Sequence, residues 1–235
     1  MIAGPSPRFW GSRTAPIRAN GYPQMLTSEE AGRQFAALAG EYHERKAAAS
    51  KRVRTWQWAT APWRDIRPLY FERHNDLPGR LLRQAPKRLR GRVEAGLDAD
   101  GRLAVQRDHA EFGYYESFCR WNAAASEIAR YHFDAHAPIN KLVLTGCLER
   151  PDSSDLIADQ GWMHEEYVWA GSRIVEVRVS HAPRVAGHYL TLQTLHTAIP
   201  RYSSTRLERV ELHWLPLSPT RPEPVVEIAY QRADV

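Results

Sequence analysis

Three side chains at alternating positions form the first candidate for chemistry in this sequence. His132, Asp134 and His136 have the spacing i, i+2, i+4, and residues spaced in this way share one face of a β-strand. Two imidazoles and a carboxylate on one face can bind Zn²⁺ or another divalent cation and leave a position for water. Arg130 precedes them on the same face and would repel a cation, so a polar, solvated strand face is the competing interpretation. The pattern leaves a metal-dependent enzyme open and implies no other cofactor.

The common catalytic motifs are missing from the chain. The sequence contains no G-x-x-x-x-G-K-[ST] phosphate loop, no G-x-G-x-x-G after a strand and no G-x-S-x-G nucleophile elbow. Cys119 and Cys147 lack the spacing of a redox pair or a zinc knuckle. Two isolated cysteines are typical of buried small hydrophobic residues in a reducing cytoplasm. An NTPase, a Rossmann dehydrogenase and an α/β-hydrolase are therefore disfavoured, and the sequence points away from an enzyme.

Positive charge is concentrated in one segment. Residues 45–92 carry 14 Lys and Arg against three Asp and Glu, whereas residues 93–235 carry 14 against 20. Such a segment either folds against the acidic remainder of its own chain or binds an outside anion. The candidate residues for binding a partner or nucleic acid are Arg52, Arg54, Arg64, Arg83, Lys87, Arg88, Arg90 and Arg92.

Tryptophans accompany this positive charge. Trp56, Trp58 and Trp63 fall within eight residues of one another. Cations can follow a phosphate backbone while aromatic rings stack on bases, which would suit a nucleic-acid surface. The competing interpretation is that the tryptophans anchor the end of a helix in the core, because aromatic side chains bury a large area. The arginines would then be solvated or paired with the acidic part of the chain.

One helix is indicated near the N-terminus. Thr27 is suited to cap it, and Glu30 closes a capping box three residues later. An apolar stripe at helical spacing follows, consisting of Ala31, Phe35, Leu38 and Tyr42. Residues 26–60 are expected to be helical, with helix-compatible residues to about Lys51. Residues 1–25, which carry proline, glycine and serine without periodicity, are expected to form a flexible arm.

From residue 66 onward, short runs alternate apolar and polar side chains, as is typical of strands. Val175, Val177 and Val179 give one example, and residues 209–214 and 226–231 show the same alternation. Clean alternation favours antiparallel strands with one solvated face. Surface loops are expected from Pro151 to Gly161 and from Pro216 to Pro224. Tight turns are expected at Asp98-Ala99-Asp100-Gly101 and at Ala170-Gly171-Ser172.

The expected architecture is therefore α+β. It is an N-terminal helix on a large curled antiparallel β-meander of seven to nine strands. A single domain spans residues 26–235, and its antiparallel hairpins occupy residues 66–232. The helix is expected to cover part of the apolar face of the sheet.

Four segments repeat one shape, a strand and a short turn followed by a new β-run. They are Tyr167–Val177, Tyr202–Val210, Asp98–Val105 and Tyr115–Tyr131. The pattern of tyrosine, turn glycine and Arg-Leu or Arg-Ile resembles the YD-type hairpin repeats of Rhs-like bacterial proteins. It is also similar to shorter bacterial proteins of immunity or accessory type with degenerate YD-like hairpins. The Tyr-Asp dipeptide itself is absent from all four segments, and any β-meander with Asp-Gly turns shares part of the pattern. The resemblance implies a meandering sheet over residues 93–232 and no catalytic residue.

Three functions follow, in order of preference. The first is a protein-binding module, a bacterial immunity or accessory protein that binds and neutralises or presents a partner. The second is nucleic-acid binding through residues 51–92, and the third is the metal-dependent enzyme described above. No stretch of the sequence approaches the ~20 apolar residues of a membrane span, and residues 1–10 lack the apolar region of a secretory signal. A cytoplasmic location without membrane contact is expected.

Overall fold

The computed structural model describes residues 26–63, 65, 67–110, 113–121, 126–133, 138–146, 152–215 and 225–232. Two helices and fourteen strands are defined in these ranges. In chain order they are α1 (Ser28–Arg52), β1 (Thr55–Ala59), α2 (Tyr70–Arg73), β2 (Leu81–Leu82), β3 (Arg92–Leu97), β4 (Leu103–His109), β5 (Tyr114–Trp121), β6 (Ser126–Phe133), β7 (Pro138–Gly146), β8 (Ser153–Ala158), β9 (Gly161–Ala170), β10 (Arg173–Val185), β11 (His188–Tyr189), β12 (Gln193–Ser203), β13 (Arg206–Trp214) and β14 (Val225–Gln231).

The strands form one antiparallel sheet in which sequence neighbours are mostly sheet neighbours. Its order is β14-β13-β12-β10-β9-β8-β7-β6-β5-β4-β3-β1-β2, and the short strand β11 pairs with β10 beside this path. The α+β class and the β-meander are thus confirmed. The expected seven to nine strands were too few, because several strands lie where the sequence shows no alternation.

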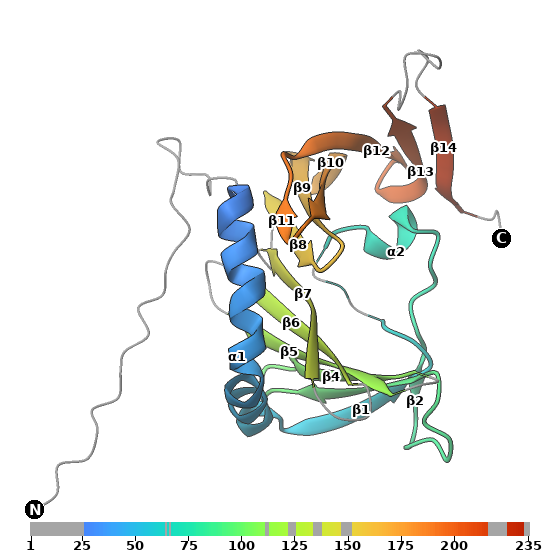
Figure 1. Ribbon diagram of the computed structural model, residues 1–235. Coiled ribbons are helices and arrows are strands. Elements are labelled where there is room, and N and C mark those ends of the chain that lie inside the picture. The colour runs from blue at the N-terminus through green and yellow to red at the C-terminus, as the bar shows by residue number, and fades with distance from the viewer. Residues whose placement is uncertain are drawn as a thin grey trace, which may run out of the picture.

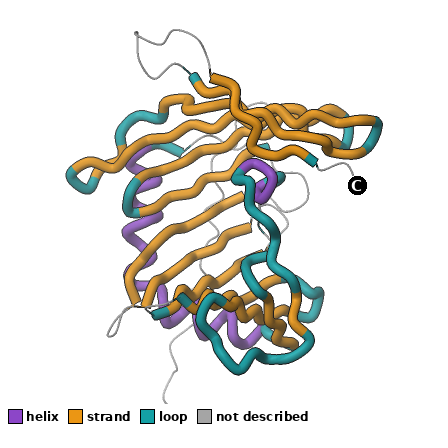
Figure 2. The backbone as a smooth tube through the Cα atoms, turned by 90° about the vertical axis from the view of Figure 1, so that its right-hand side faces the viewer, coloured by secondary structure: helices purple, strands orange, loops and turns teal. Residues whose placement is uncertain are grey.

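The sheet curls, and the two helices lie on its opposite faces. In Figure 1 the strands bend around α2, while α1 runs along the outside of β4 to β8. Figure 2 looks into the hollow side, where α2 and the loops before β3 lie in front of the strands and α1 lies behind them. The convex face is therefore covered by α1, and part of the concave face is covered by α2.

The predicted start of α1 is confirmed. The Thr27 hydroxyl accepts a hydrogen bond from the backbone N–H of Glu30, and the Glu30 carboxylate accepts one from the backbone N–H of Thr27. The two bonds satisfy helix-terminal donors that would otherwise lack partners. The expected helical range 26–60 is too long, since α1 ends at Arg52 and residues 55–59 form β1. Val53 already has an extended backbone, and β1 pairs with β3 along its whole length.

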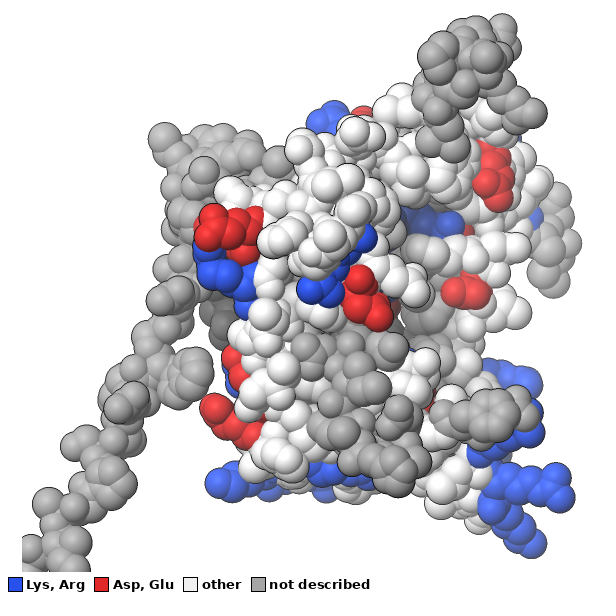
Figure 3. Space-filling model, viewed as in Figure 1, with Lys and Arg blue, Asp and Glu red and all other residues white. Residues whose placement is uncertain are grey.

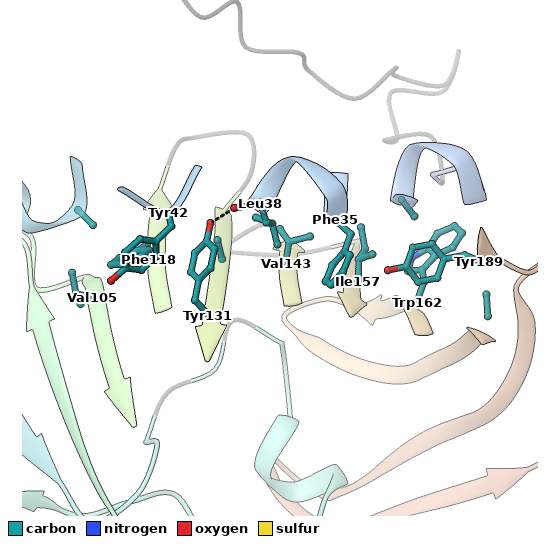
Figure 4. Close-up of a cluster of buried hydrophobic side chains, with 14 residues drawn as sticks. Phe35, Leu38, Tyr42, Val105, Phe118, Tyr131, Val143, Ile157, Trp162 and Tyr189 are labelled. Atoms are coloured by element: carbon teal, nitrogen blue, oxygen red, sulfur yellow. Dashed lines mark hydrogen bonds between the residues drawn. The ribbon is translucent and has the colours of Figure 1, made fainter. Parts of the chain in front are cut away.

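The main core lies between α1 and the convex face. The predicted helix stripe is buried there and packs on strand residues that include Val105, Phe118, Tyr131, Val143, Ile157 and Trp162 (Figure 4). The Tyr131 hydroxyl donates a hydrogen bond of 3.0 Å to the Leu38 carbonyl, so its polar end is satisfied inside this core. Burial of about ten large side chains at roughly 1.5–3 kcal/mol each is the main force that holds α1 on the sheet.

Two smaller clusters lie on the concave face. One joins Tyr167, Val177 and Val179 to residues of β12, β13 and β14, and Leu69 beside α2 packs on it. The other contains Leu97, Leu103 and Cys119, with Trp63 against it. The prediction of a buried cysteine is confirmed for Cys119, and Cys147 lies outside the described residues. The concave face is thus partly filled by Trp63, Leu69 and α2.

The turn predictions have mixed outcomes. Gly101 and Gly171 both have φ near +60 to +72° in tight turns between paired strands, as glycine permits. Each of the four repeated segments contains strand residues that pair with the neighbouring antiparallel strand of the sheet. The expected loop from Pro151 to Gly161 is wrong, because residues 153–158 form β8 between β7 and β9. The expected arm 1–25 and the loop at residues 216–224 lie outside the described residues.

Candidate functional site

The predicted metal site stays a prediction, because the structure describes only one of its three residues, His132. Strand β6 ends at Phe133, and both Asp134 and His136 lie outside the described residues. The ring of His132 packs against Tyr115 with a centroid distance of 4.7 Å. The guanidinium of Arg130 forms an ion pair with Asp108 and lies over the Tyr115 ring. Among the described residues, no group of three His, Cys, Asp or Glu side chains is placed to hold a metal ion.

The basic segment divides into a buried part and an exposed part. Arg73 of α2 reaches the concave face and binds Glu165 of β9 in a bidentate ion pair, with N···O distances of 3.1 and 2.7 Å. Both side chains are only 2 % exposed. The Tyr167 hydroxyl donates a third hydrogen bond of 2.6 Å to Glu165, and Ser154 lies 2.7 Å from that hydroxyl. This part of the segment does fold against the acidic remainder of the chain.

The carboxylate of this pair lies in a row of residues across five strands. The strand register places Ser154, Glu165, Val179, His196 and Trp214 opposite one another on β8, β9, β10, β12 and β13. Neighbouring strands lie about 4.8 Å apart, so each residue packs on the next. Arg73 lies against this row, and the row therefore fixes where α2 docks.

The ionisation of this row follows from its burial. Burial opposes the charge on Glu165, but the Arg73 guanidinium outweighs it and holds the pKa of the carboxyl below its usual range. Burial lowers the pKa of His196 to about 4, and the charge of Arg73 acts in the same direction. His196 is therefore neutral at physiological pH. Its Nδ1 and the Nε of Arg73 are buried without a hydrogen-bond partner among the described residues.

The exposed part of the basic segment lies at the β2 edge of the sheet. The side chains of Arg80, Arg83, Lys87 and Arg88 are exposed and have no ion-pair partner among the described residues. Figure 3 shows Lys and Arg gathered at the lower right, over the region of β2, and along the lower edge of the molecule. We call residues 77–91 the basic edge.

The remaining predicted binding residues have other roles or lie elsewhere. Arg52 is partly buried and donates to the backbone carbonyl of Cys119, which ties the end of α1 to β5. Arg54 is exposed and donates to the carbonyl of Lys51 over 3.4 Å. Arg92 begins β3 and donates to the Gly91 carbonyl over 3.3 Å. Arg90 is exposed. Arg64 lies outside the described residues.

Apolar side chains are exposed among the cations of the basic edge. Leu77, Leu81 and Leu89 are 87 %, 55 % and 43 % exposed. Trp56 of the neighbouring strand β1 is 44 % exposed, so the expectation that it anchors the core is wrong. The ring of Trp58 stacks on the ring of His109, with the two centroids 5.7 Å apart. Trp63 packs on the cluster around Cys119, as expected of an anchor.

Hydrogen bonds hold the basic edge at both ends. The backbone N–H of Gly79 donates to the Pro62 carbonyl over 2.8 Å, and Thr60 and Arg80 exchange two bonds of 3.0 and 2.9 Å. At the other end, the N–H of Gly91 donates to the His109 carbonyl over 2.6 Å. Pairing of β1 with β2 lies between them. The cations and leucines are thus carried by a segment whose path is fixed.

A second buried network joins α1 to the convex face. Glu116 is fully buried and accepts hydrogen bonds from Tyr42 over 2.7 Å and from Arg107 over 2.8 Å, while Lys46 lies 3.2 Å away. Burial opposes ionisation of Glu116, but these donors keep its pKa below the usual range. The Glu116 carboxylate is paired with cations in this network, which attaches α1 to the sheet. We therefore assign the network a structural role.

A histidine–aspartate pair lies farther along the same face. His164 and Asp155 are joined by a hydrogen bond of 2.8 Å, and Trp162 donates to the same carboxylate oxygen over 2.9 Å. Burial disfavours the charged imidazole, but the Asp155 carboxylate outweighs it and raises the pKa of His164. Among the described residues, no serine or threonine hydroxyl and no cysteine thiol is placed beside this pair as a nucleophile would be. We therefore assign it a structural role.

Comparisons with known proteins return no match, whether against protein-family models, curated proteins or solved structures. In the described part of the chain, neither helix is long and apolar enough to cross a membrane. The resemblance to YD-type repeats thus stays a prediction.

Sequence reasoning missed the concave row altogether. Ser154 lies in a stretch that reads as a loop, and Glu165 beside Glu166 reads as part of a solvated face. The sequence does carry one signal for this site, which is the cluster of tyrosine and tryptophan around Glu165. A charged residue among aromatic side chains needs a partner when it is buried.

Proposed function

We propose that this protein is a protein-binding module that contacts an acidic partner through the basic edge. In this proposal it acts as an immunity or accessory protein of a bacterial system, which neutralises or presents that partner. The observation that carries the proposal is the unpaired state of Arg80, Arg83, Lys87 and Arg88 among the described residues.

Several cations elsewhere in the described chain are paired with carboxylates. Arg45 pairs with Glu41 and Glu127, and Arg107 pairs with Glu94 and Glu116. The four unpaired cations of the basic edge lie close together in the sequence, so they form a local excess of positive charge on a sheet edge. Such a patch raises the association rate with a partner of opposite charge and helps to select it.

The nucleic-acid alternative uses the same cations but needs accessible aromatic faces. Stacking on bases requires rings that project into solvent. Trp58 is stacked on His109, and Trp63 packs on a core cluster. Trp56 is 44 % exposed, but the Arg107 guanidinium lies over its ring at 5.2 Å from the centroid. The ring of Tyr70 is covered by the Arg67 guanidinium at 4.1 Å from its centroid. A protein partner therefore fits the described surface better than single-stranded nucleic acid does.

The test is affinity capture with a matched pair of charge-reversal variants. One variant carries Arg83→Glu, Lys87→Glu and Arg88→Glu. The control carries Arg102→Glu, Arg206→Glu and Arg232→Glu, which are exposed positions away from the basic edge and change the net charge equally. Captured proteins are identified by mass spectrometry and then purified for binding measurements at two salt concentrations.

The proposal expects one discrete protein that binds the wild type and the control variant but not the basic-edge variant. Its affinity should fall as salt rises, because salt screens exposed charges. Capture of nucleic acid in place of protein would favour the nucleic-acid alternative. In that case the logarithm of the affinity should fall linearly with log[salt]. Equal capture by all three forms would refute a role for the basic edge.

A further inference from the structure

We infer that the basic edge recognises an amphipathic acidic protein segment, in which aliphatic side chains accompany Asp and Glu. This inference rests on the proposed function and names the class of partner. The cations alone would accept any polyanion. The exposed leucines make the surface more selective than that.

The leucines and cations alternate through a short stretch of chain. In order they are Leu77, Arg80, Leu81, Arg83, Lys87, Arg88 and Leu89. The leucines are exposed by 43 % or more. A single exposed apolar residue is ordinary on a protein surface. Three lie in this segment, and two of them, Leu81 and Leu89, directly adjoin the unpaired cations Arg80 and Arg88. This combination matches the composition of an interface with apolar contacts inside a polar rim.

The backbone of the segment is built for a fixed presentation. A Cβ added at Gly79 would lie 1.9 Å from the Ala61 carbonyl oxygen, so the chain at this point is pressed directly on its neighbour. The bonds from Gly79 to Pro62 and from Gly91 to His109 close the segment on the sheet. A surface whose path is already fixed loses little conformational entropy when it binds.

Recognition by side chains follows from the shape of the edge. Strand β2 has only two residues, which is too short for a partner strand to extend the sheet by several backbone hydrogen bonds. The partner must therefore be read by the leucines and the cations. An acidic segment with aliphatic side chains satisfies both, since the carboxylates meet the cations while the apolar groups cover Leu81 and Leu89.

The test uses defined peptides as probes. One fluorescent peptide is a helical sequence with Leu at positions i, i+3, i+4 and i+7 and Glu elsewhere. A second replaces every Leu with Ala, and a third probe is a single-stranded oligonucleotide of similar charge. Binding to the full chain is measured by fluorescence anisotropy at low and moderate salt.

Two triple variants separate the contributions at constant fold. Leu77→Ser, Leu81→Ser and Leu89→Ser removes the apolar groups without a charge change, and Val175→Ser, Val226→Ser and Ile228→Ser is the control at other exposed positions. Circular dichroism and thermal melting verify that each variant folds. The charge-reversal variant of the previous section is measured beside them.

The inference expects the Glu/Leu peptide to bind the wild type at least about tenfold more tightly than the Glu/Ala peptide, since one well-buried aliphatic contact accounts for about that factor. The leucine variant should lose this difference, and the control should keep it. If all probes bind equally, or if no peptide binds, the inference is overturned. If the leucine variant behaves as the wild type while charge reversal abolishes binding, the inference fails and the proposed function stands. If neither variant changes binding, both fail.

Discussion

The buried pair of Arg73 and Glu165 makes a sharp prediction about stability. Replacing Arg73 by methionine keeps the volume of the side chain roughly constant but leaves the Glu165 carboxylate buried without its cation. The bidentate bonds of 3.1 and 2.7 Å disappear, and only the Tyr167 hydroxyl remains as a donor to that carboxylate. An uncompensated charge inside a protein is costly, so the folded state should be strongly destabilised.

The expected loss follows from the burial of both partners. Each side chain is 2 % exposed, so solvent screens the pair very little. Removing one partner of such a pair costs about 3–5 kcal/mol. In a chain of this size, 1 kcal/mol changes Tm by about 2–4 °C. The Arg73→Met variant should therefore melt roughly 6–20 °C below the wild type at pH 7.

The assay is thermal and urea unfolding, across pH, of Arg73→Met, Glu165→Gln and the double variant beside the wild type. Arg73→Met should lose the full amount, whereas Arg73→Met combined with Glu165→Gln should recover most of it, because no charge is then buried alone. In the wild type the pKa of Glu165 is lowered, so its contribution is present above the unfolded pKa of about 4.3 and is lost as pH falls through the folded pKa. In Arg73→Met burial dominates and raises that pKa. The difference in free energy of unfolding between the wild type and Arg73→Met should therefore become smaller as pH falls.

Two results would refute this reasoning. The first is a loss below about 1 kcal/mol for Arg73→Met at pH 7, which would mean that water reaches Glu165. The second is a double variant whose loss equals the sum of the two single losses, since coupled partners must be non-additive. Hydrogen exchange of residues 67–80 gives an independent measure, because α2 should open more readily once Arg73 no longer binds the sheet.

Three further predictions concern other parts of the fold. The pKa of His196 is about 4 in the folded protein, below its value near 6.5 in the unfolded chain, so the unfolded state binds more protons between these two values. The free energy of unfolding should therefore fall as pH drops from about 6.5 to 4. An NMR titration should show a neutral His196 ring at pH 5.5. Tyr42→Phe should cost about 1–3 kcal/mol in urea unfolding, because the buried carboxylate of Glu116 loses the donor that lies 2.7 Å away; a loss within error of zero would contradict the structural role of that network. Gly79→Ala should destabilise the protein and increase proteolysis of the basic edge, since its Cβ would lie 1.9 Å from the backbone oxygen of Ala61; an unchanged digestion pattern would show that this contact does not hold the segment.

Local patterns were sufficient to predict the helix and much of the sheet. The capping box at Thr27 and Glu30 places the start of α1 correctly, because both bonds are made within four residues. Alternation predicts β10 and β13, where Val177, Val179, Val210 and Leu212 are buried as expected. Strand β14 also lies at its predicted place, but Val226 and Ile228 on its expected apolar face are more than half exposed. The turn at Gly101 follows from its backbone freedom, and its φ is +72°. These features depend on neighbours in the sequence, so the sequence is enough to find them.

Other features depend on contacts that only the folded chain creates. Strand β8 has the Ser- and Asp-rich composition of a loop, but both of its edges pair with strands, and Ser154 hydrogen-bonds the Tyr167 hydroxyl that binds Glu165. Strand β1 directly follows a helix and could not be told from its continuation.

The candidate site shows the same limit. Arg73 and Arg83 look alike in a basic segment, yet one meets a carboxylate 92 residues away and the other stays in solvent. No local pattern distinguishes them.

The meander and the helix also differ in when they can form on the ribosome. From β3 to β10 each strand pairs with the next one along the chain, so each hairpin closes a short loop and can form as it emerges. Helix α1 leaves the ribosome first, but its apolar stripe packs on residues as late as Trp162 and Tyr189. At roughly 5–20 residues per second, that stripe waits on the order of ten seconds for its cover. The nascent helix is thus the segment that we expect a chaperone to bind, and a chain truncated before β11 should be prone to aggregate through it.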